Sequence, residues 1–150
     1  MDEAFKEMRR IEKVFSKFDK DSELSRLNRL AGKEEVIVTP ALFGIIERSI
    51  NYSEISGGSF DITAGSKIQG RYKDLLLDRG SGSVHFLSRN LKIDLGGIAK
   101  GYAVDRARDI LSSYGIKNAL VNIGGNMFAL GSPPGRESWR IGIRDPKDKR

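Results

Sequence analysis

The feature of this sequence with the clearest chemical use is a strand-like segment that runs into two glycines and then into a helix. It covers residues 93–102 (IDLGGIAKGY). Glycines let backbone approach a ligand closely, and a helix N-terminus presents unpaired N–H groups at its positive end, which suit phosphate. Lys100 can neutralise a phosphate oxygen, and Asp94 can accept hydrogen bonds from a ribose or a base, or assist a metal. The alternative is a tight turn whose glycines only let the helix pack on a sheet. The spacing matches neither a Walker A loop nor the three-glycine Rossmann fingerprint.

A second segment places an aromatic residue among polar ones. Residues 57–65 (GGSFDITAG) hold Phe60 beside Asp61 and Thr63. In an exposed loop, this combination could offer an aromatic face and polar contacts to a flat ring. The alternative is a loop that ends a helix, with Phe60 in the core and Asp61 as a cap. The segment taken alone favours that structural interpretation.

Two further segments are weaker still. Phe15 and Phe18 precede residues 21–28 (DSELSRLN), and residues 122–125 (NIGG) follow a strand-like run. Phenylalanines at helical spacing are usually core residues, and Ser22 is a typical helix cap. The glycines at 124–125 bring backbone close to a ligand or only to a neighbouring helix.

Four helices are expected to position these segments. Apolar residues recur every three or four positions from Phe5 to Phe18, which predicts an amphipathic helix. Ser22 predicts the start of a short helix that runs to Asn28, and Thr39 followed by proline predicts a helix to about residue 55. The strongest helical pattern covers residues 98–114.

The expected strands are short. They cover residues 35–39, 84–87, 91–95, 119–123 and 139–143. The turn at residues 88–90 predicts that the second and third form a hairpin. Helices and strands do not alternate strictly, so the pattern favours an α+β fold, with a mixed or antiparallel sheet packed with helices. Residues 1–150 show no repeat or linker and are expected to form a single domain.

Composition limits the class of protein. The 150 residues are 39% hydrophobic and 31% charged, which is typical of a globular domain. No apolar run is long enough for a membrane span, and the charged N-terminus does not resemble a signal peptide, so the compartment stays open. The chain has no cysteine and only His85 as histidine, which excludes disulfides and a histidine-built zinc site within one chain.

The net charge of +6 is spread along the chain rather than concentrated. A charge excess suits an anionic partner or simply a solvated surface. No block of Lys and Arg is interleaved with aromatic residues, so nucleic acid is not expected as a partner.

Taken together and in order, these segments resemble the FAD:protein FMN transferase family, also called ApbE. The similarity runs through residues 21–28, 60–63, 93–105 (IDLGGIAKGYAVD) and 122–125, and continues into residues 139–143 (WRIGI). It covers essentially the whole chain, and residues 93–105 are its most specific part.

The resemblance implies an ApbE-like fold and an activity. Family members bind FAD and, with magnesium, transfer FMN to a Thr or Ser hydroxyl of a target flavoprotein, often a subunit of an ion-translocating redox complex. Some relatives instead hydrolyse FAD to FMN and AMP. A flavin-binding fragment without turnover is the alternative for this chain.

The resemblance also implies which residues contact FAD and magnesium, while it assigns no catalytic residue. It places Phe18 beside the flavin and Ser59, Phe60 and Asp61 on a loop that touches FAD. In the glycine segment, Asp94 and Lys100 fall on FAD-contacting positions, and Gly97 falls where a backbone carbonyl helps to bind magnesium.

The chain departs from the family pattern in three places. Its first helix starts almost at Met1, without the strand that usually precedes this helix in the family. Its connection after Thr63 is short, and it stops at Arg150, where a family member runs on for about as long again. The further residues normally complete the sheet and the magnesium site. These 150 residues are therefore expected to be the N-terminal part of an ApbE-like FAD-binding domain, incomplete at the C-terminus and weak in transferase activity.

Overall fold

The computed structural model describes residues 2–66 and 71–142. Its helices are α1 (Asp2–Phe15), α2 (Glu23–Leu30), α3 (Pro40–Ile55) and α4 (Ala99–Ser113), with a short 3-10 helix η1 (Tyr72–Asp74). Its strands are β1 (Val36–Ile37), β2 (Leu75–Asp78), β3 (Ser83–Phe86), β4 (Ala119–Ile123) and β5 (Asn126–Leu130). The α+β prediction with antiparallel sheets packed against helices is confirmed.

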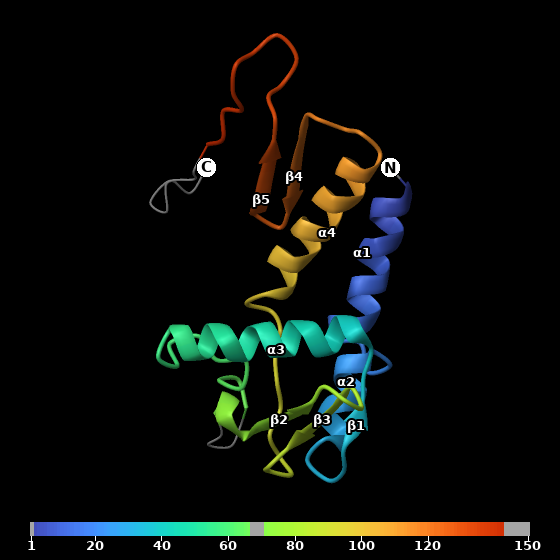
Figure 1. The fold of residues 1–150 in the computed structure, drawn as a ribbon, viewed down its shortest axis with the longest axis vertical. Helices are drawn as coiled ribbons and strands as arrows, with labels where there is room; N and C mark the ends of the chain where they lie inside the picture. The colour runs from blue at the N-terminus through green and yellow to red at the C-terminus, as the bar shows by residue number, and fades with distance from the viewer. Residues whose placement is uncertain (1, 67–70, 143–150) are drawn as a thin grey trace.

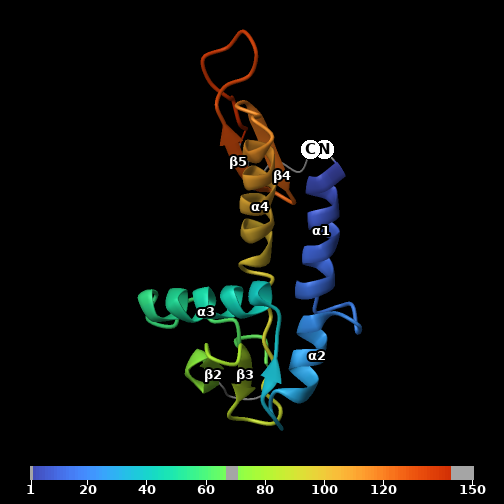
Figure 2. The same ribbon diagram turned by 45° about the vertical axis from the view of Figure 1, so that its right-hand side comes forward.

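The elements form two groups, one on each side of α3. In Figure 1, α3 crosses the molecule almost at right angles to α1 and α4, which run alongside each other above it. Below α3 lie α2 and a three-stranded antiparallel sheet in the order β1-β3-β2. Turned by 45°, Figure 2 keeps the same separation.

The lower group contains most of the core. Apolar side chains of α2 and α3 and of the sheet are almost fully buried there: Leu24, Leu27, Leu42, Ile46, Val84 and Phe86. Their spacing along α2 and α3 produces the apolar faces that the sequence predicts.

Both predicted helix starts in this group are confirmed. The Ser22 hydroxyl accepts a hydrogen bond from the Ser25 amide, at 3.0 Å, and caps α2. Thr39 caps α3 in the same way through the Leu42 amide, and Pro40 occupies the first turn. Each cap satisfies an amide that the helix itself leaves without a partner.

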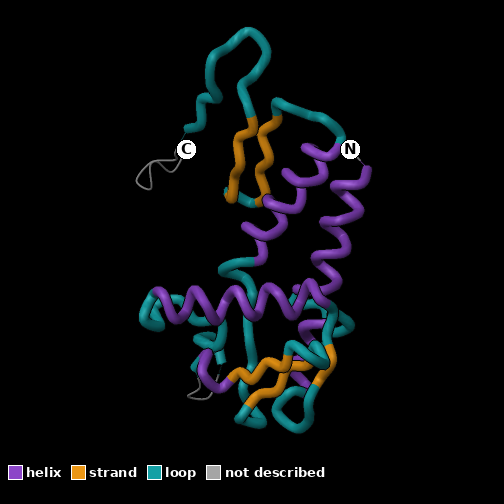
Figure 3. The backbone as a smooth tube through the Cα atoms, viewed as in Figure 1, coloured by secondary structure: helices purple, strands orange, loops and turns teal. Residues whose placement is uncertain are grey.

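The upper group joins the first helix to residues near the end of the chain. Glu7 of α1 accepts hydrogen bonds from Arg10, at 2.7 Å, and from Arg106 of α4, at 3.4 Å. Nearer α3, the Phe15 ring meets Tyr102 of α4 edge to face, with centroids 5.2 Å apart. The β4–β5 hairpin packs on the other side of α4, as the tube in Figure 3 shows.

Two of the five predicted strands are not found in the described residues, and two observed strands were not predicted. Strand β3 pairs with β2 and β1, whereas residues 91–95, which were expected to form its hairpin partner, are not in a strand. Strands β2 and β5 were not predicted, although β4 turns directly into β5. Residues 139–142 are not in a strand, and residue 143 lies outside the described part.

The β4–β5 turn has a simple explanation. Gly124 and Gly125 have φ values of 57° and 90°, which are the left-handed values that a two-residue hairpin turn of type I′ requires at both positions. Only glycine adopts them without a steric penalty. The pair was noted in the sequence as a place of close backbone approach, but not as a hairpin turn.

None of the helices in the described ranges is both long and apolar enough to cross a membrane.

Candidate functional site

The glycine segment links the two groups of elements and begins α4. The Leu95 carbonyl accepts hydrogen bonds from the amides of Ile98 and Ala99, at 3.0 and 2.8 Å, which tightens the turn before the helix. Ile98 occupies the N-cap position and gives no side-chain cap. The start of α4 therefore lacks the side-chain acceptor that α2 and α3 have, and an external anion could take that place.

Asp94 is held at the beginning of this turn. Its carboxylate accepts a hydrogen bond from the Gly96 amide, at 2.8 Å, and forms an ion pair with Lys17 from the segment after α1. Burial favours the neutral acid, but the hydrogen bonds from Lys17 and Gly96 outweigh it and keep the pKa of Asp94 below its ordinary value. The carboxylate is therefore charged at neutral pH and about one third exposed.

Phe18 and Asp94 line the same pocket, although they lie 76 positions apart in the sequence. The pocket has a volume of about 410 Å3. Phe18 is 88% exposed, and Lys17 Nζ lies 5.1 Å from its ring centroid. An exposed phenyl ring at a pocket edge is available to a flat ligand, because no protein side chain covers most of its surface.

The same pocket is strongly cationic. Four of its side chains are basic and one is acidic: Lys17, Lys20, Arg29, Lys92 and Asp94. Only Lys17 forms an ion pair with the acid. Such an excess of positive charge in a hollow favours anionic ligands such as phosphates.

The loop after α3 uses most of its polar groups internally. One Asp61 carboxylate oxygen accepts hydrogen bonds from the Thr63 amide and hydroxyl, both at 2.8 Å, and the other accepts one from the Tyr72 amide, at 3.1 Å. Asp61 thus fixes the loop, as the structural interpretation of this segment expected. Ser59 is exposed at the loop surface.

Phe60 and Gly97 bring the two motif segments into contact. A Cβ atom on Gly97 would lie 3.2 Å from the Phe60 ring, so the ring packs directly on the glycine. The Tyr52 ring meets Phe60 edge to face, at 6.3 Å between centroids. A side chain at position 97 would require the Phe60 ring to move by a few tenths of an ångström.

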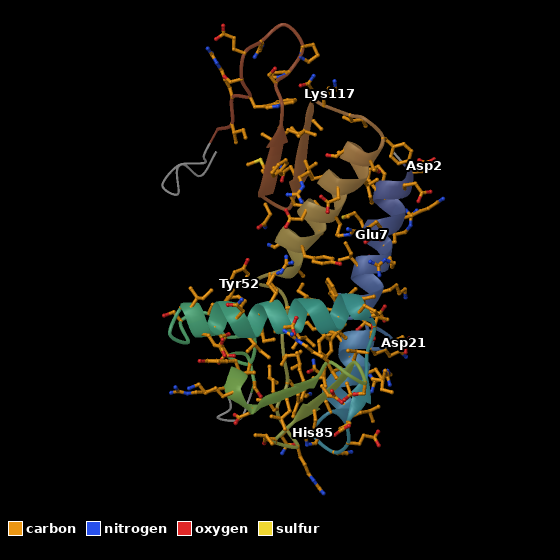
Figure 4. The ribbon with its side chains drawn as sticks, viewed as in Figure 1. Asp2, Glu7, Asp21, Tyr52, His85 and Lys117 are labelled. Atoms are coloured by element: carbon orange, nitrogen blue, oxygen red, sulfur yellow. The ribbon has the colours of Figure 1, made fainter. Side chains whose placement is uncertain are left out.

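A smaller hollow of about 210 Å3 lies on the α3 side of Gly97. Arg48 and Tyr52 of α3 and Asp105 of α4 contribute its polar groups. Figure 4 shows Tyr52 on the face of α3 that is turned toward α4. Asp94 and Gly97, three positions apart, therefore line two different hollows.

The Gly97 carbonyl fits a role as a ligand of a hard cation. Among the described residues, no backbone amide bonds to it, whereas the carbonyls of Leu95 and Ile98 each accept one or two hydrogen bonds. In the described ranges no three His, Cys, Asp or Glu side chains gather around one point. Because magnesium keeps several waters and takes phosphate oxygens, a carbonyl is a reasonable single ligand from this segment.

The candidate residues fall into three places rather than one. Phe18 and Asp94 share the cationic pocket, while Phe60 and Gly97 are in contact beside the second hollow. Lys100 is exposed and lines a third, mainly apolar hollow between α1 and α4.

The sequence alone did not single out two features of the cationic pocket. One is the group of basic residues near Phe18, and the other is Asn28. Lys20, Arg29 and Lys92 stand in three different segments, with acidic residues between them. Only the side-by-side placement of those segments makes them one group. Asn28 belongs to the segment 21–28 that was noticed, but nothing local indicates its contacts.

Three comparisons with known proteins agree. The model of the ApbE family matches residues 1–150. The chain is 30% identical over 182 aligned residues to the FAD:protein FMN transferase of Treponema pallidum, with 97% of this chain and 50% of that protein covered. An FAD:protein FMN transferase of Klebsiella pneumoniae is 27% identical, with 95% and 51% covered.

Solved structures show the same relation. The crystal structure of the ApbE protein from Thermotoga maritima matches with a TM-score of 0.88 and 30% identity, covering 99% of this chain and 56% of that one. The flavin transferase ApbE from Vibrio cholerae matches with a TM-score of 0.84 and 25% identity, covering 96% and 54%. The chain thus spans about half the length of the relatives that it matches.

Proposed function

This chain belongs to the ApbE family, and on that premise we propose that it acts in the transfer of FMN from FAD to a Thr or Ser hydroxyl of a target flavoprotein. The observation that supports this most is the joint placement of Phe18 and Asp94 in a cationic pocket at the glycine turn. The pocket combines a surface for a flat ring with charge for phosphates. The relatives named FAD:protein FMN transferase supply the reaction class.

The isoalloxazine ring of FAD is proposed to lie against Phe18. Lys20, Arg29 and Lys92 line the same pocket and supply positive charge for the ribityl phosphate side. The Asp94 carboxylate, kept charged by Lys17 and Gly96, accepts hydrogen bonds from ligand hydroxyls or ring N–H groups. Ser59, Phe60 and Asp61 form the adjoining loop, in which Phe60 touches the turn.

The pyrophosphate is proposed to lie at the glycine turn and the start of α4. Phosphoryl transfer depends on positioning and on neutralising the phosphate charge. The uncapped amides of α4 and the Lys100 ammonium contribute to this neutralisation. Magnesium, when bound, adds two positive charges there, and the Gly97 carbonyl is its proposed ligand from this segment.

In the reaction, the acceptor hydroxyl oxygen bonds to the phosphorus of the FMN half. The bond from that phosphorus to the bridging oxygen breaks, AMP leaves with that oxygen, and the proton of the acceptor hydroxyl is released to solvent. The described residues bind and orient FAD for this step. The target is proposed to be a flavoprotein subunit of a redox complex.

A titration of FAD followed by flavin fluorescence, with and without magnesium, tests the proposal. Asp94→Ala is expected to weaken binding at least about tenfold, since a charged hydrogen-bonding partner is lost. Asp78→Ala is a matched control, because the Asp78 carboxylate also accepts from an amide two positions on, that of Gly80, at 2.8 Å, but lies in the β2–β3 turn. Absence of binding to the unaltered chain would contradict the proposal.

Product analysis separates transfer from the two alternatives. Incubation with FAD, magnesium and a Thr-containing target protein gives FMN on the target and free AMP if FMN is transferred. Free FMN and AMP without modified target indicate hydrolysis. Tight binding without AMP release indicates a flavin-binding fragment.

A further inference from the structure

The side chain of Asn28, on α2, forms two hydrogen bonds with the backbone of Ile93 in the glycine segment. Its amide nitrogen donates to the Ile93 carbonyl, at 2.9 Å, and its amide oxygen accepts from the Ile93 amide, at 2.8 Å. The side chain therefore pairs with both backbone groups of one residue, as a neighbouring strand would. Within residues 2–66 and 71–142 no strand pairs with residues 91–95, and Asn28 supplies the partners of Ile93 there.

These two hydrogen bonds serve the backbone groups of a buried residue. Ile93 is 2% exposed and packs in the main core. Buried backbone N–H and C=O groups need partners, and a lost partner leaves the full cost of desolvation. Among ordinary side chains, an amide is the one that offers a donor and an acceptor side by side.

Asp94 follows directly in the chain, and its own amide is also held. It donates to the Ile62 carbonyl, at 2.8 Å, which ties the turn to the loop that carries Phe60 and Asp61. Asn28 on one side and Ile62 on the other thus fix the backbone from which the Asp94 side chain projects. Asn28 also lines the cationic pocket, so the bonds lie at the proposed ligand site.

We infer that Asn28 is a positioning residue: by pairing with Ile93 it holds the Asp94 carboxylate where FAD meets it. This inference rests on the proposed function, because it assigns a purpose to the placement of Asp94. It assigns Asn28 no contact with the reacting atoms. Its effect on FAD must pass through Asp94 and the turn.

A double-mutant cycle of Asn28→Ala and Asp94→Ala tests this, with FAD affinity and thermal unfolding measured on all four chains. Asn28→Ala is expected to weaken FAD binding about tenfold in the unaltered background and less than about twofold when Asp94 is already alanine. The unfolding temperature should fall equally in both backgrounds. A purely structural residue would give the same loss of affinity in both, which would overturn the inference.

A control and a second variant keep the test decisive. Asn51→Ala, at an exposed position near the end of α3, should change neither affinity nor stability. Should Asn28→Ala not fold, Asn28→Gln replaces it, since it keeps the amide but moves it by one methylene. Gln is expected to weaken binding in the same Asp94-dependent way, and unchanged affinity would overturn the inference.

A measurement without ligand separates this inference from the proposed function. The amide proton of Gly96 donates to Asp94, so its NMR chemical shift reports where the carboxylate lies. In the Asn28 variants this shift should move toward its value in Asp94→Ala. If FAD does not bind but the shift moves, the proposed function fails and the positioning role holds. An unchanged shift overturns the positioning role whatever FAD does.

Discussion

At the scale of single residues, exposure separates ligand-facing candidates from structural ones. Phe18 and Asp61 come from equally suggestive segments, but Phe18 is 88% exposed whereas Asp61 accepts three hydrogen bonds from its own surroundings. A side chain that is almost fully exposed contributes little to folding. Its removal should therefore act on binding alone, whereas removal of Asp61 would disturb the loop as well.

Phe18→Ala is the prediction that follows. FAD affinity should fall about two- to tenfold, because an aromatic stack is worth ~0.5–1.5 kcal/mol beyond buried area, and the unfolding temperature should stay the same. Fluorescence titration and a thermal melt measure the two effects. Phe5→Ala, on the exposed surface of α1, is the control and should alter neither. A drop in stability without a change in affinity would show that Phe18 is a packing residue.

At the scale of elements, single polar side chains fix where helices begin and how they pack. Ser22 caps α2 and its hydroxyl also donates to the Ser16 carbonyl, while the residue is fully buried. Glu7 joins α1 to α4 with its side chain only 13% exposed. Each of these contacts determines the geometry of a segment that carries a candidate site residue.

Ser22→Ala should destabilise the fold by about 1–2 kcal/mol, since the helix loses its cap and the Ser16 carbonyl loses a donor. Urea unfolding measures this difference. Ser112→Ala, at an exposed position near the end of α4, is the control and should cost under about 0.5 kcal/mol. Equal costs for the two variants would contradict the role of the cap.

Glu7 makes a pH-dependent prediction. Hydrogen bonds from Arg10 and Arg106 hold the pKa of Glu7 below its ordinary value, although burial opposes them. The folded pKa is therefore lower than the unfolded value of about 4.3. The contribution of the charged Glu7 carboxylate to the stability of the fold is fully present above the unfolded pKa and is lost as the pH falls through the lowered folded pKa.

Glu7→Gln should accordingly lower the free energy of unfolding by about 1–2 kcal/mol at pH 7 and by progressively less below about pH 4. Urea unfolding at several pH values gives the comparison. Glu12→Gln, on the exposed side of the same helix, should follow the unaltered protein throughout. A loss of unfolding free energy that stays constant down to pH 2 would rule out the ion pair as the source of that loss. Figure 4 shows Glu7 between α1 and α4.

At the scale of the whole molecule, the β4–β5 hairpin has one covered face and one open face. Val121 and Phe128 pair across the strands on the half-buried face, where Arg108 of α4 lies over the Phe128 ring. On the other face, Leu120 and Met127 are each 41% exposed. An isolated two-stranded sheet with an apolar outer face is a surface suited to association.

Replacing Leu120 and Met127 together by lysine should reduce concentration-dependent self-association and the binding of a dye that detects exposed apolar surface. The free energy of unfolding should change by less than about 1 kcal/mol. Analytical ultracentrifugation and a thermal melt measure the two. Val121→Lys, on the covered face, is the contrast and should destabilise the fold by about 2 kcal/mol or more. If the double variant associates like the unaltered protein, the open face is not the surface involved.

The sequence by itself determined the local features. Caps at Ser22 and Thr39, the apolar periodicity of the helices and the glycine segment before α4 were all readable, because each depends on residues a few positions apart. The order of the motif segments was enough to indicate the family, which the comparisons confirm. The α+β class followed from the same local patterns.

Only the tertiary structure decided which segments meet. Residues 91–95 alternate like a strand, but β2 takes the place beside β3, and Asn28 and Ile62 satisfy that backbone instead. The cationic pocket likewise exists only because the segments carrying Phe18, Arg29 and Asp94 fold against one another. Strand pairing and pocket formation depend on contacts between residues far apart in the chain. Local propensity depends only on neighbouring residues and therefore does not predict these contacts.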